Sequence, residues 1–149
     1  MQIFDTHAHY DDAAFDADRE ALLGSLPEQG VRAVLSAAVD PESARRTLAL
    51  CRQYPGFLFG AIGIHPEMVG QAPDSWLRDI YTLSADPACR AIGEIGLDYH
   101  YEDGAPRAVQ REWFRRQLAL AQERNLPVVI HDRDAHEDTL KILEEYKPR

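Results

Sequence analysis

The chain opens with a short apolar segment that ends in two histidines, His7 and His9, separated by one residue. Side chains two residues apart in a β-strand point to the same face of the strand. Both imidazoles would therefore reach one point, as two ligands of a single metal ion must. A His-x-His triplet is a weak signal by itself, and the alternative is a pair of hydrogen-bonded polar residues at a strand end.

Further polar residues lie at or beside the ends of later apolar segments. His65 follows one such segment, Glu94 lies inside the next, and His131 ends the last. A carboxylate among glycines and aliphatic residues is costly to bury unless it is paired or binds a cation, which favours a functional role for Glu94. His65 either contacts a substrate or completes a turn. Asp98 and Arg133 lie just beyond strand ends, and we expect both to contact substrate.

The elements that must position these residues follow a regular order. Apolar segments predict strands, and segments with apolar residues at helical spacing alternate with them. Asp40 before Pro41 is typical of a helix start, and Asp134 with Glu137 resembles a capping box. The strands are expected over residues 3–10, 31–39, 57–64, 90–95 and 126–130, and the helices over 15–26, 41–54, 74–84, 106–121 and 134–146.

Five consecutive βα units of this kind predict a parallel sheet covered by helices. Right-handed crossovers place the carboxyl ends of all parallel strands on the same side of a sheet. Barrels and open α/β sheets build their sites on that side. The residues at the strand ends are therefore expected to meet in one shared metal site.

Composition limits the classes of protein. The chain has 149 residues, which suits one domain over residues 1–149, and a net charge of −9. This charge argues against broad adhesion to nucleic acid or to anionic membrane, although a bound cation would still receive a phosphate. No apolar run approaches the roughly 20 residues that span a bilayer. Without a visible signal peptide, we expect a cytoplasmic protein with Cys51 and Cys89 reduced.

Four segments carry a resemblance to a known family. They resemble, in order and spacing, the signatures of the TatD family of metal-dependent hydrolases. The resemblance implies a TIM barrel of the amidohydrolase type and 3′-to-5′ exonuclease action on DNA with divalent metals. The segments are Phe4-Asp5-Thr6-His7-Ala8-His9, Gly63-Ile64-His65-Pro66, Gly93-Glu94-Ile95-Gly96-Leu97-Asp98-Tyr99 and Leu126-Pro127-Val128-Val129-Ile130-His131.

The resemblance also implies roles for individual residues. His7 and His9 would bind one metal ion, and Glu94, the catalytic carboxylate, would bridge it to a second ion that His131 helps to hold. His65 would lie near the scissile phosphate. Mixed imidazole and carboxylate ligands suit Mg, Mn, Co or Zn, and the sequence does not choose among these metals.

The sequence departs from the family in length. A TIM barrel needs eight βα units and about 250 residues, whereas five units are present, so the fold is expected to be an incomplete barrel. The metal-ligand His of the sixth strand and the Asp of the last strand have no counterpart in these residues. Three explanations are open: a piece of a longer protein, two associating chains, or a short form with altered or no activity. We favour the first, and expect the short chain to form a homo-oligomer that covers its open sheet edges.

Two other function classes stay open. One is a different amidohydrolase that acts on a lactone or an amide, although several of these enzymes carry a modified Lys where Glu94 stands. The other is a non-catalytic half-barrel that binds metal. The second class predicts metal uptake without turnover, and a panel of substrates would separate the first from a nuclease.

Overall fold

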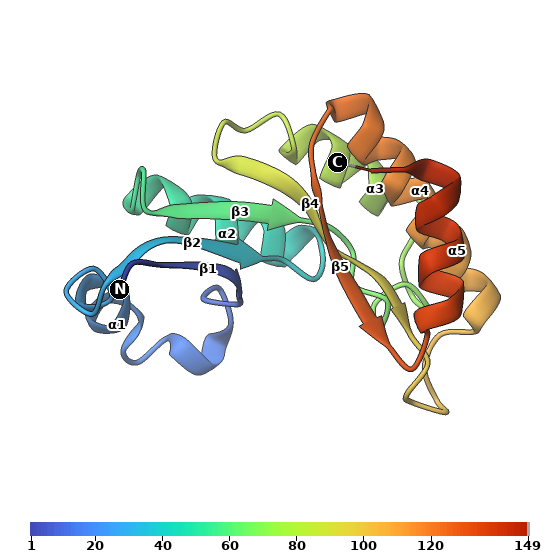
Figure 1. Ribbon diagram of the computed structural model, residues 1–149, viewed down its shortest axis with the longest axis horizontal. Helices are drawn as coiled ribbons and strands as arrows, with labels where there is room; N and C mark the ends of the chain where they lie inside the picture. The colour runs from blue at the N-terminus through green and yellow to red at the C-terminus, as the bar shows by residue number, and fades with distance from the viewer. Residues whose placement is uncertain (149) are drawn as a thin grey trace.

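The computed structural model describes residues 1–148 and contains one parallel sheet of five strands in the order β1-β2-β3-β4-β5 (Figure 1). Each strand is followed by a helix, so the predicted series of βα units and the incomplete barrel are confirmed. The strands are β1 (Ile3–Ala8), β2 (Val31–Ala37), β3 (Leu58–Ile62), β4 (Cys89–Asp98) and β5 (Val128–Arg133). The helices are η1 (Ala13–Phe15), α1 (Arg19–Ser25), α2 (Pro41–Gln53), α3 (Ser75–Leu83), α4 (Arg107–Arg124) and α5 (His136–Tyr146).

Helix starts follow local chemistry at one site and tertiary contacts at another. The Asp40 side chain accepts a hydrogen bond from the Ser43 N–H (2.8 Å), and Pro41 is the first residue of α2, as predicted. The capping box expected at Asp134 does not form. Asp134 has a positive φ of 54°, and its carboxylate lies 2.8 Å from His100 Nδ1 instead. Helix α5 therefore begins two residues later, at His136.

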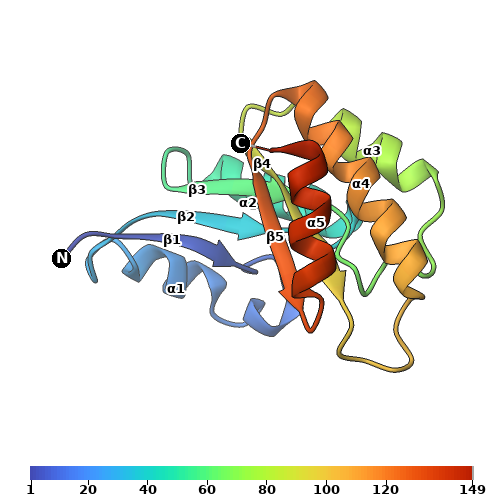
Figure 2. The same ribbon diagram turned by 45° about the vertical axis from the view of Figure 1, so that its right-hand side comes forward.

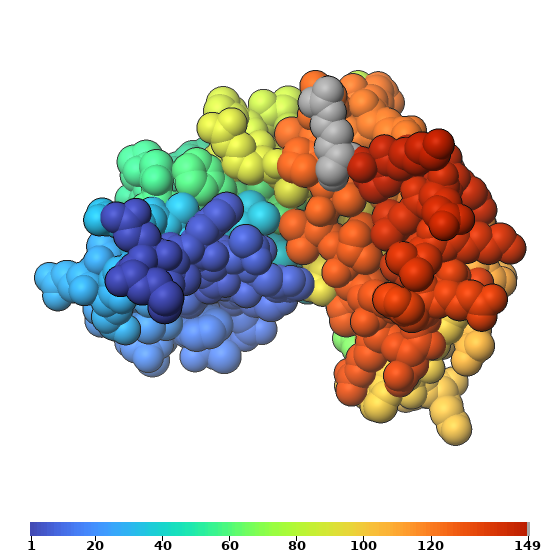
Figure 3. Space-filling view, in the orientation of Figure 1, coloured from blue at the N-terminus to red at the C-terminus, as the bar shows by residue number. Residues whose placement is uncertain are grey.

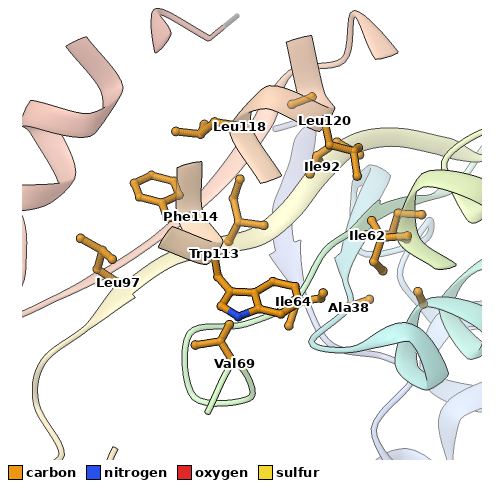
Figure 4. Close-up of a cluster of buried hydrophobic side chains, with 14 of the residues drawn as sticks. Ala38, Ile62, Ile64, Val69, Ile92, Leu97, Trp113, Phe114, Leu118 and Leu120 are labelled. Atoms are coloured by element: carbon orange, nitrogen blue, oxygen red, sulfur yellow. The ribbon is translucent and has the colours of Figure 1, made fainter. Parts of the chain in front are cut away.

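The main core lies between β4 and α4. Phe114 and Leu118 of α4 are fully buried and pack in one cluster with Ile92 and Leu97 of β4 (Figure 4). These two side chains are four residues apart, so they share one helical face. Burial of several large apolar groups here fixes α4 against the strand that carries Glu94. In Figure 2, α2, α3 and α4 lie on one side of the sheet.

The opposite, concave side of the sheet is uncovered. Phe4, Leu35, Phe59 and Val129 line a cavity of about 680 Å³ there, and Figure 3 shows the molecule deeply hollowed between its N-terminal and C-terminal parts. Phe4, in the apolar segment that opens the chain, is 57% exposed. The reason is topological, since β1 is an edge strand whose inner face no other described residue covers. Within residues 1–148, no helix is long and apolar enough to cross a bilayer.

Candidate metal centre

Glu94 occupies the centre of a cluster of four histidines. It lies in the middle of β4, is 4% exposed, and directs its two carboxylate oxygens to different partners. Oε2 lies 2.9 Å from His7 Nε2, and Oε1 lies 2.8 Å from His131 Nδ1. The carboxylate therefore connects residues that come from the two edge strands of the sheet. The carboxylate thus offers one oxygen to each of two groups of imidazoles.

His7 and His9 converge on one side of this carboxylate. Their Nε2 atoms lie 3.2 Å apart, and His9 Nε2 is 3.5 Å from Glu94 Oε2. The Nδ1 atom of His9 lies 2.7 Å from the carbonyl oxygen of Ala37, at the end of β2. That contact fixes the ring so that Nε2 faces the cluster. The predicted convergence of the His-x-His pair is thus present in the structure.

His65 and His131 converge on the other side. His65 Nε2 lies 3.0 Å from His131 Nδ1, and the two rings meet edge to face at a centroid distance of 4.3 Å. The sequence predicted a role near the substrate for His65. The structure instead places its Nε2 atom among the donor atoms around Glu94, so His65 is available as a third ligand of this second group. Its role as substrate contact stays a prediction.

The electrostatics of the cluster keep Glu94 ionised. Burial raises the pKa of this carboxyl, but the hydrogen bond with His131 and the charges of His7 and His65 outweigh burial and lower the pKa to about 2. Burial and the neighbouring His131 lower the pKa of His65 to about 4, so this imidazole is neutral at pH 7 with a lone pair to donate. An ionised carboxylate and a neutral imidazole are the forms that bind metal.

Glycines on either side of Glu94 allow β5 to approach closely. A Cβ atom added at Gly96 would lie 2.0 Å from the carbonyl oxygen of His131, and one added at Gly93 would lie 2.6 Å from Val129 Cβ. Gly96 also has a φ of 147°, which side chains other than glycine rarely adopt. The register pairs Gly96 with His131. The two glycines therefore permit the strand contact that brings His131 to Glu94.

Asp98 supports His131 from behind. It was expected to lie just beyond its strand, but it is the last residue of β4 and is 4% exposed. Its expected contact with substrate stays a prediction. Its Oδ2 atom lies 2.8 Å from His131 Nε2, and its Oδ1 atom accepts a hydrogen bond from the His100 N–H (2.9 Å). Burial raises the pKa of Asp98, but the hydrogen bonds from His100 and His131 outweigh it and lower the pKa. A carboxylate behind a ligating histidine fixes the orientation and tautomer of the ring.

Two glutamines of α4 hold the strand ends and were missed by the sequence reasoning. The Gln117 side chain accepts from the Ile64 N–H (2.7 Å) and donates to the Ile64 carbonyl oxygen (3.0 Å). Gln110 makes the same pair of bonds with the backbone of Asp98 (2.8 and 2.7 Å). Both are almost fully buried. The signal was present in the sequence, because these residues are seven apart and share the apolar face of Phe114.

The donor atoms form two groups that suit divalent cations. His7, His9 and Glu94 form the first, and His65, Glu94 and His131 form the second, with the ligand atoms of each group within 4.8 Å of one another. Each group offers two imidazole nitrogens and one carboxylate oxygen. This is a common ligand set for Zn, Mn and Co, and a less favourable one for Mg. Glu94 alone belongs to both groups.

Comparison with known proteins places the chain in a family. Residues 4–149 match the family described as TatD related DNase. The chain is 40% identical over 143 residues to the uncharacterized metal-dependent hydrolase YabD of Bacillus subtilis, covering 96% of the chain and 55% of the relative. It is 35% identical over 141 residues to the 3′-5′ ssDNA/RNA exonuclease TatD of Yersinia pseudotuberculosis, covering 95% and 54%.

A solved structure gives the same result. The crystal structure of the TatD homologue YjjV from Escherichia coli K12 matches with a TM-score of 0.90 and 32% identity, covering 98% of this chain and 56% of that protein. The chain spans about half the length of the curated relatives that it matches. Fold, motifs and sequence identity agree, and the chain belongs to the TatD related DNase family.

Proposed function

We propose that this chain carries the metal-binding part of a two-metal phosphodiesterase that removes nucleotides from DNA in the 3′-to-5′ direction. The observation that supports this most is Glu94, whose two oxygens face two separate groups of imidazoles, 2.9 Å from His7 and 2.8 Å from His131. Phosphodiester cleavage brings an anionic nucleophile to an anionic substrate, so it requires concentrated positive charge. Divalent cations held there would neutralise the phosphate and acidify a water molecule.

The protein's own residues would prepare the site in three ways. Glu94, the catalytic carboxylate, would link the two ligand groups and set their separation. The His65 imidazole would remain a neutral donor, since burial and the neighbouring His131 lower its pKa to about 4. Asp98 would fix the ring of His131 through the 2.8 Å contact to Nε2. The site lies at the carboxyl ends of the strands, where a substrate has access from the solvent.

The substrate class follows from charge and from the relatives. A protein with a net charge of −9 offers little general attraction for nucleic acid. Cations in the Glu94 cluster would create one positive spot at which a phosphate binds. Relatives are named as 3′-5′ ssDNA/RNA exonucleases, which supports a nucleic-acid substrate over a lactone or an amide.

Metal binding is tested with Glu94→Gln. The amide keeps the size of the side chain but removes its charge and one acceptor oxygen. We expect the variant to retain far less Mn, Co or Zn than the parent after equilibrium dialysis and elemental analysis. The matched control is Glu123→Gln, which alters an exposed carboxylate that accepts from the Tyr81 hydroxyl. Equal metal content in the parent and the Glu94 variant would remove Glu94 from the site.

Catalysis is tested on a labelled single-stranded oligonucleotide. The parent, a His7→Ala/His9→Ala variant and the control His136→Ala would be compared with each metal and with a chelator. Metal-dependent shortening from the 3′ end, lost only in the double variant, would support the proposal. Metal uptake without cleavage would instead support a metal-binding half-barrel that is not catalytic by itself.

A further inference from the structure

Arg133 lies on the same side of β5 as the predicted metal ligand His131. Asp132, between them, points to α5, where its Oδ2 atom lies 2.8 Å from His136 Nδ1. Because side chains alternate along a strand, His131 and Arg133 face the opposite side, where Glu94 contacts His131. Arg133 ends the strand. It therefore stands at the rim of the candidate metal centre, one step nearer the solvent than His131.

Arg133 forms no close ion pair with a carboxylate of residues 1–148, although Asp98 and Asp134 act on its charge from further away. Its Nη1 atom donates to the Tyr101 hydroxyl (3.1 Å), and no carboxylate among residues 1–148 lies within 4.0 Å of the guanidinium. Three arginines of α4 differ in this respect, because Arg111, Arg115 and Arg116 each form an ion pair at 2.9, 2.9 and 2.7 Å. An exposed, unpaired guanidinium beside a phosphodiesterase site is suited to bind a phosphate.

Tyr101 provides an aromatic surface beside this charge. It is 48% exposed, and the Arg133 guanidinium carbon lies 5.1 Å from the ring centroid. The edge of His100 approaches the same ring at 5.0 Å. His100 in turn is held by Asp134, 2.8 Å from its Nδ1 atom, and by Asp98, which accepts from its N–H at 2.9 Å. The ring is thus tied to the carboxylate that supports the candidate metal centre.

We propose that Tyr101 and Arg133 form a nucleotide-binding subsite at the rim of the metal centre. The guanidinium binds a phosphate of the substrate, and the phenol ring stacks with the neighbouring base. This inference rests on the proposed function and adds the residues that hold the strand next to the cleaved bond. Stacking needs a base that is free of its partner strand, so the subsite takes an unpaired end. Arg133 ends β5, and Tyr101 follows the end of β4 by three residues. These two strand ends lie side by side in Figures 1 and 2.

Binding of an uncleavable strand tests the subsite directly. The probe is a fluorescent phosphorothioate oligothymidylate in Mg²⁺, followed by anisotropy. We expect Tyr101→Leu to bind about tenfold more weakly than the parent and Tyr101→Phe to bind like the parent, since stacking needs only the ring. On an oligonucleotide without bases, Tyr101→Leu and the parent should bind equally.

The chain offers a matched control pair. Arg124 stacks over Tyr81 at 3.8 Å from the ring centroid, and Tyr81 is 39% exposed. This pair lies near the start of β4, at the opposite end of the strand from Asp98. Arg124 is the last residue of α4, and its charge is close enough to Cys89, the first residue of β4, to lower the pKa of that thiol. Tyr81→Leu should leave binding of the probe unchanged.

The salt dependence of binding isolates the phosphate contact. Affinity falls with added salt, and the loss of one phosphate contact to single-stranded DNA makes the plot of log affinity against log salt less steep by about 0.7. We expect this change in Arg133→Gln and not in Arg124→Gln. No binding by the parent, or equal losses in the Tyr101 and Tyr81 variants, would overturn the subsite.

The proposed phosphodiesterase activity is measured separately as hydrolysis of methyl p-nitrophenyl phosphate, a phosphodiester without a nucleobase. Metal-dependent hydrolysis with unchanged binding in the Tyr101 and Arg133 variants would remove the subsite alone. Absence of hydrolysis by the parent would count against the proposed function, whatever the binding data show.

Discussion

The contact between His131 and Asp98 determines which ring nitrogen is available to a cation. Nε2 lies 2.8 Å from the Asp98 carboxylate, and Nδ1 faces Glu94 at 2.8 Å. An ionised carboxylate only accepts hydrogen bonds, so each ring nitrogen donates to one of these two acids. Burial lowers the pKa of His131, but its hydrogen bonds with Glu94 and Asp98 outweigh burial and raise it. A cation on the Glu94 side would take the place of the Nδ1 proton, while Asp98 would keep the proton on Nε2. Asp98 therefore acts on metal binding by holding His131, without belonging to either ligand group.

Replacing this carboxylate should weaken metal binding. In Asp98→Asn the side chain keeps its size but can turn its NH₂ group toward Nε2, which favours the wrong tautomer. Loss of such a support typically costs about 10- to 100-fold in metal affinity. We expect a loss of this size for Co²⁺ or Zn²⁺ by isothermal titration calorimetry. Asp132→Asn is the control, because Asp132 makes a similar 2.8 Å contact to His136 outside the cluster. Equal affinities in both variants would contradict the role of Asp98.

The convergence of Glu94 with the four histidines could be predicted because each lies at or beside the end of an apolar segment, where parallel topology collects side chains. The direction of Asp98 could not, since it depends on how far β4 extends. The sequence predicted a strand over residues 90–95, and pairing with β5 continues it to Asp98. The Tyr101 and Arg133 contact likewise joins residues 32 apart and leaves no local pattern.

At the scale of elements, α4 does more than cover the sheet. Gln110 and Gln117 each bond both backbone groups of one residue, Asp98 at the end of β4 and Ile64 two residues after the end of β3. Ile64 precedes His65, and Asp98 holds His131, so α4 acts on two histidines of the cluster through their neighbours. Helical spacing predicted the apolar face of α4, but it gave no reason to expect glutamine side chains to replace missing strand partners.

Removing one of these side chains should lower stability. In Gln117→Leu, the N–H and carbonyl of Ile64 stay buried without their partner. Each unsatisfied group costs about 1–3 kcal/mol, so we expect the free energy of unfolding to fall by about 2–4 kcal/mol in urea titrations. Gln122→Leu, on an exposed part of the same helix, should change it by less than about 0.5 kcal/mol. Equal stability of the parent and Gln117→Leu would show that water replaces the side chain.

At the scale of the whole molecule, the sheet has one covered and one bare face. The α-helices bury one side, whereas Phe4, Leu35 and Phe59 line an open apolar cavity of about 680 Å³ on the other. In a closed barrel these side chains would meet residues from further strands. The apolar segments predicted strands, and the exposure of Phe4 at 57% follows from the open sheet rather than from local sequence.

This bare face predicts that the 149-residue chain associates with itself, because exposed apolar surface next to open strand edges is buried most simply by a second copy. Sedimentation velocity should show a concentration-dependent increase in mass for the parent. Phe4→Glu places a charge in the cavity and should shift the equilibrium toward the monomer. Leu140→Glu is the control, since Leu140 is 49% exposed on α5, away from the cavity. A parent that stays monomeric at high concentration, or equal effects of both substitutions, would show that the concave face is not where two copies meet.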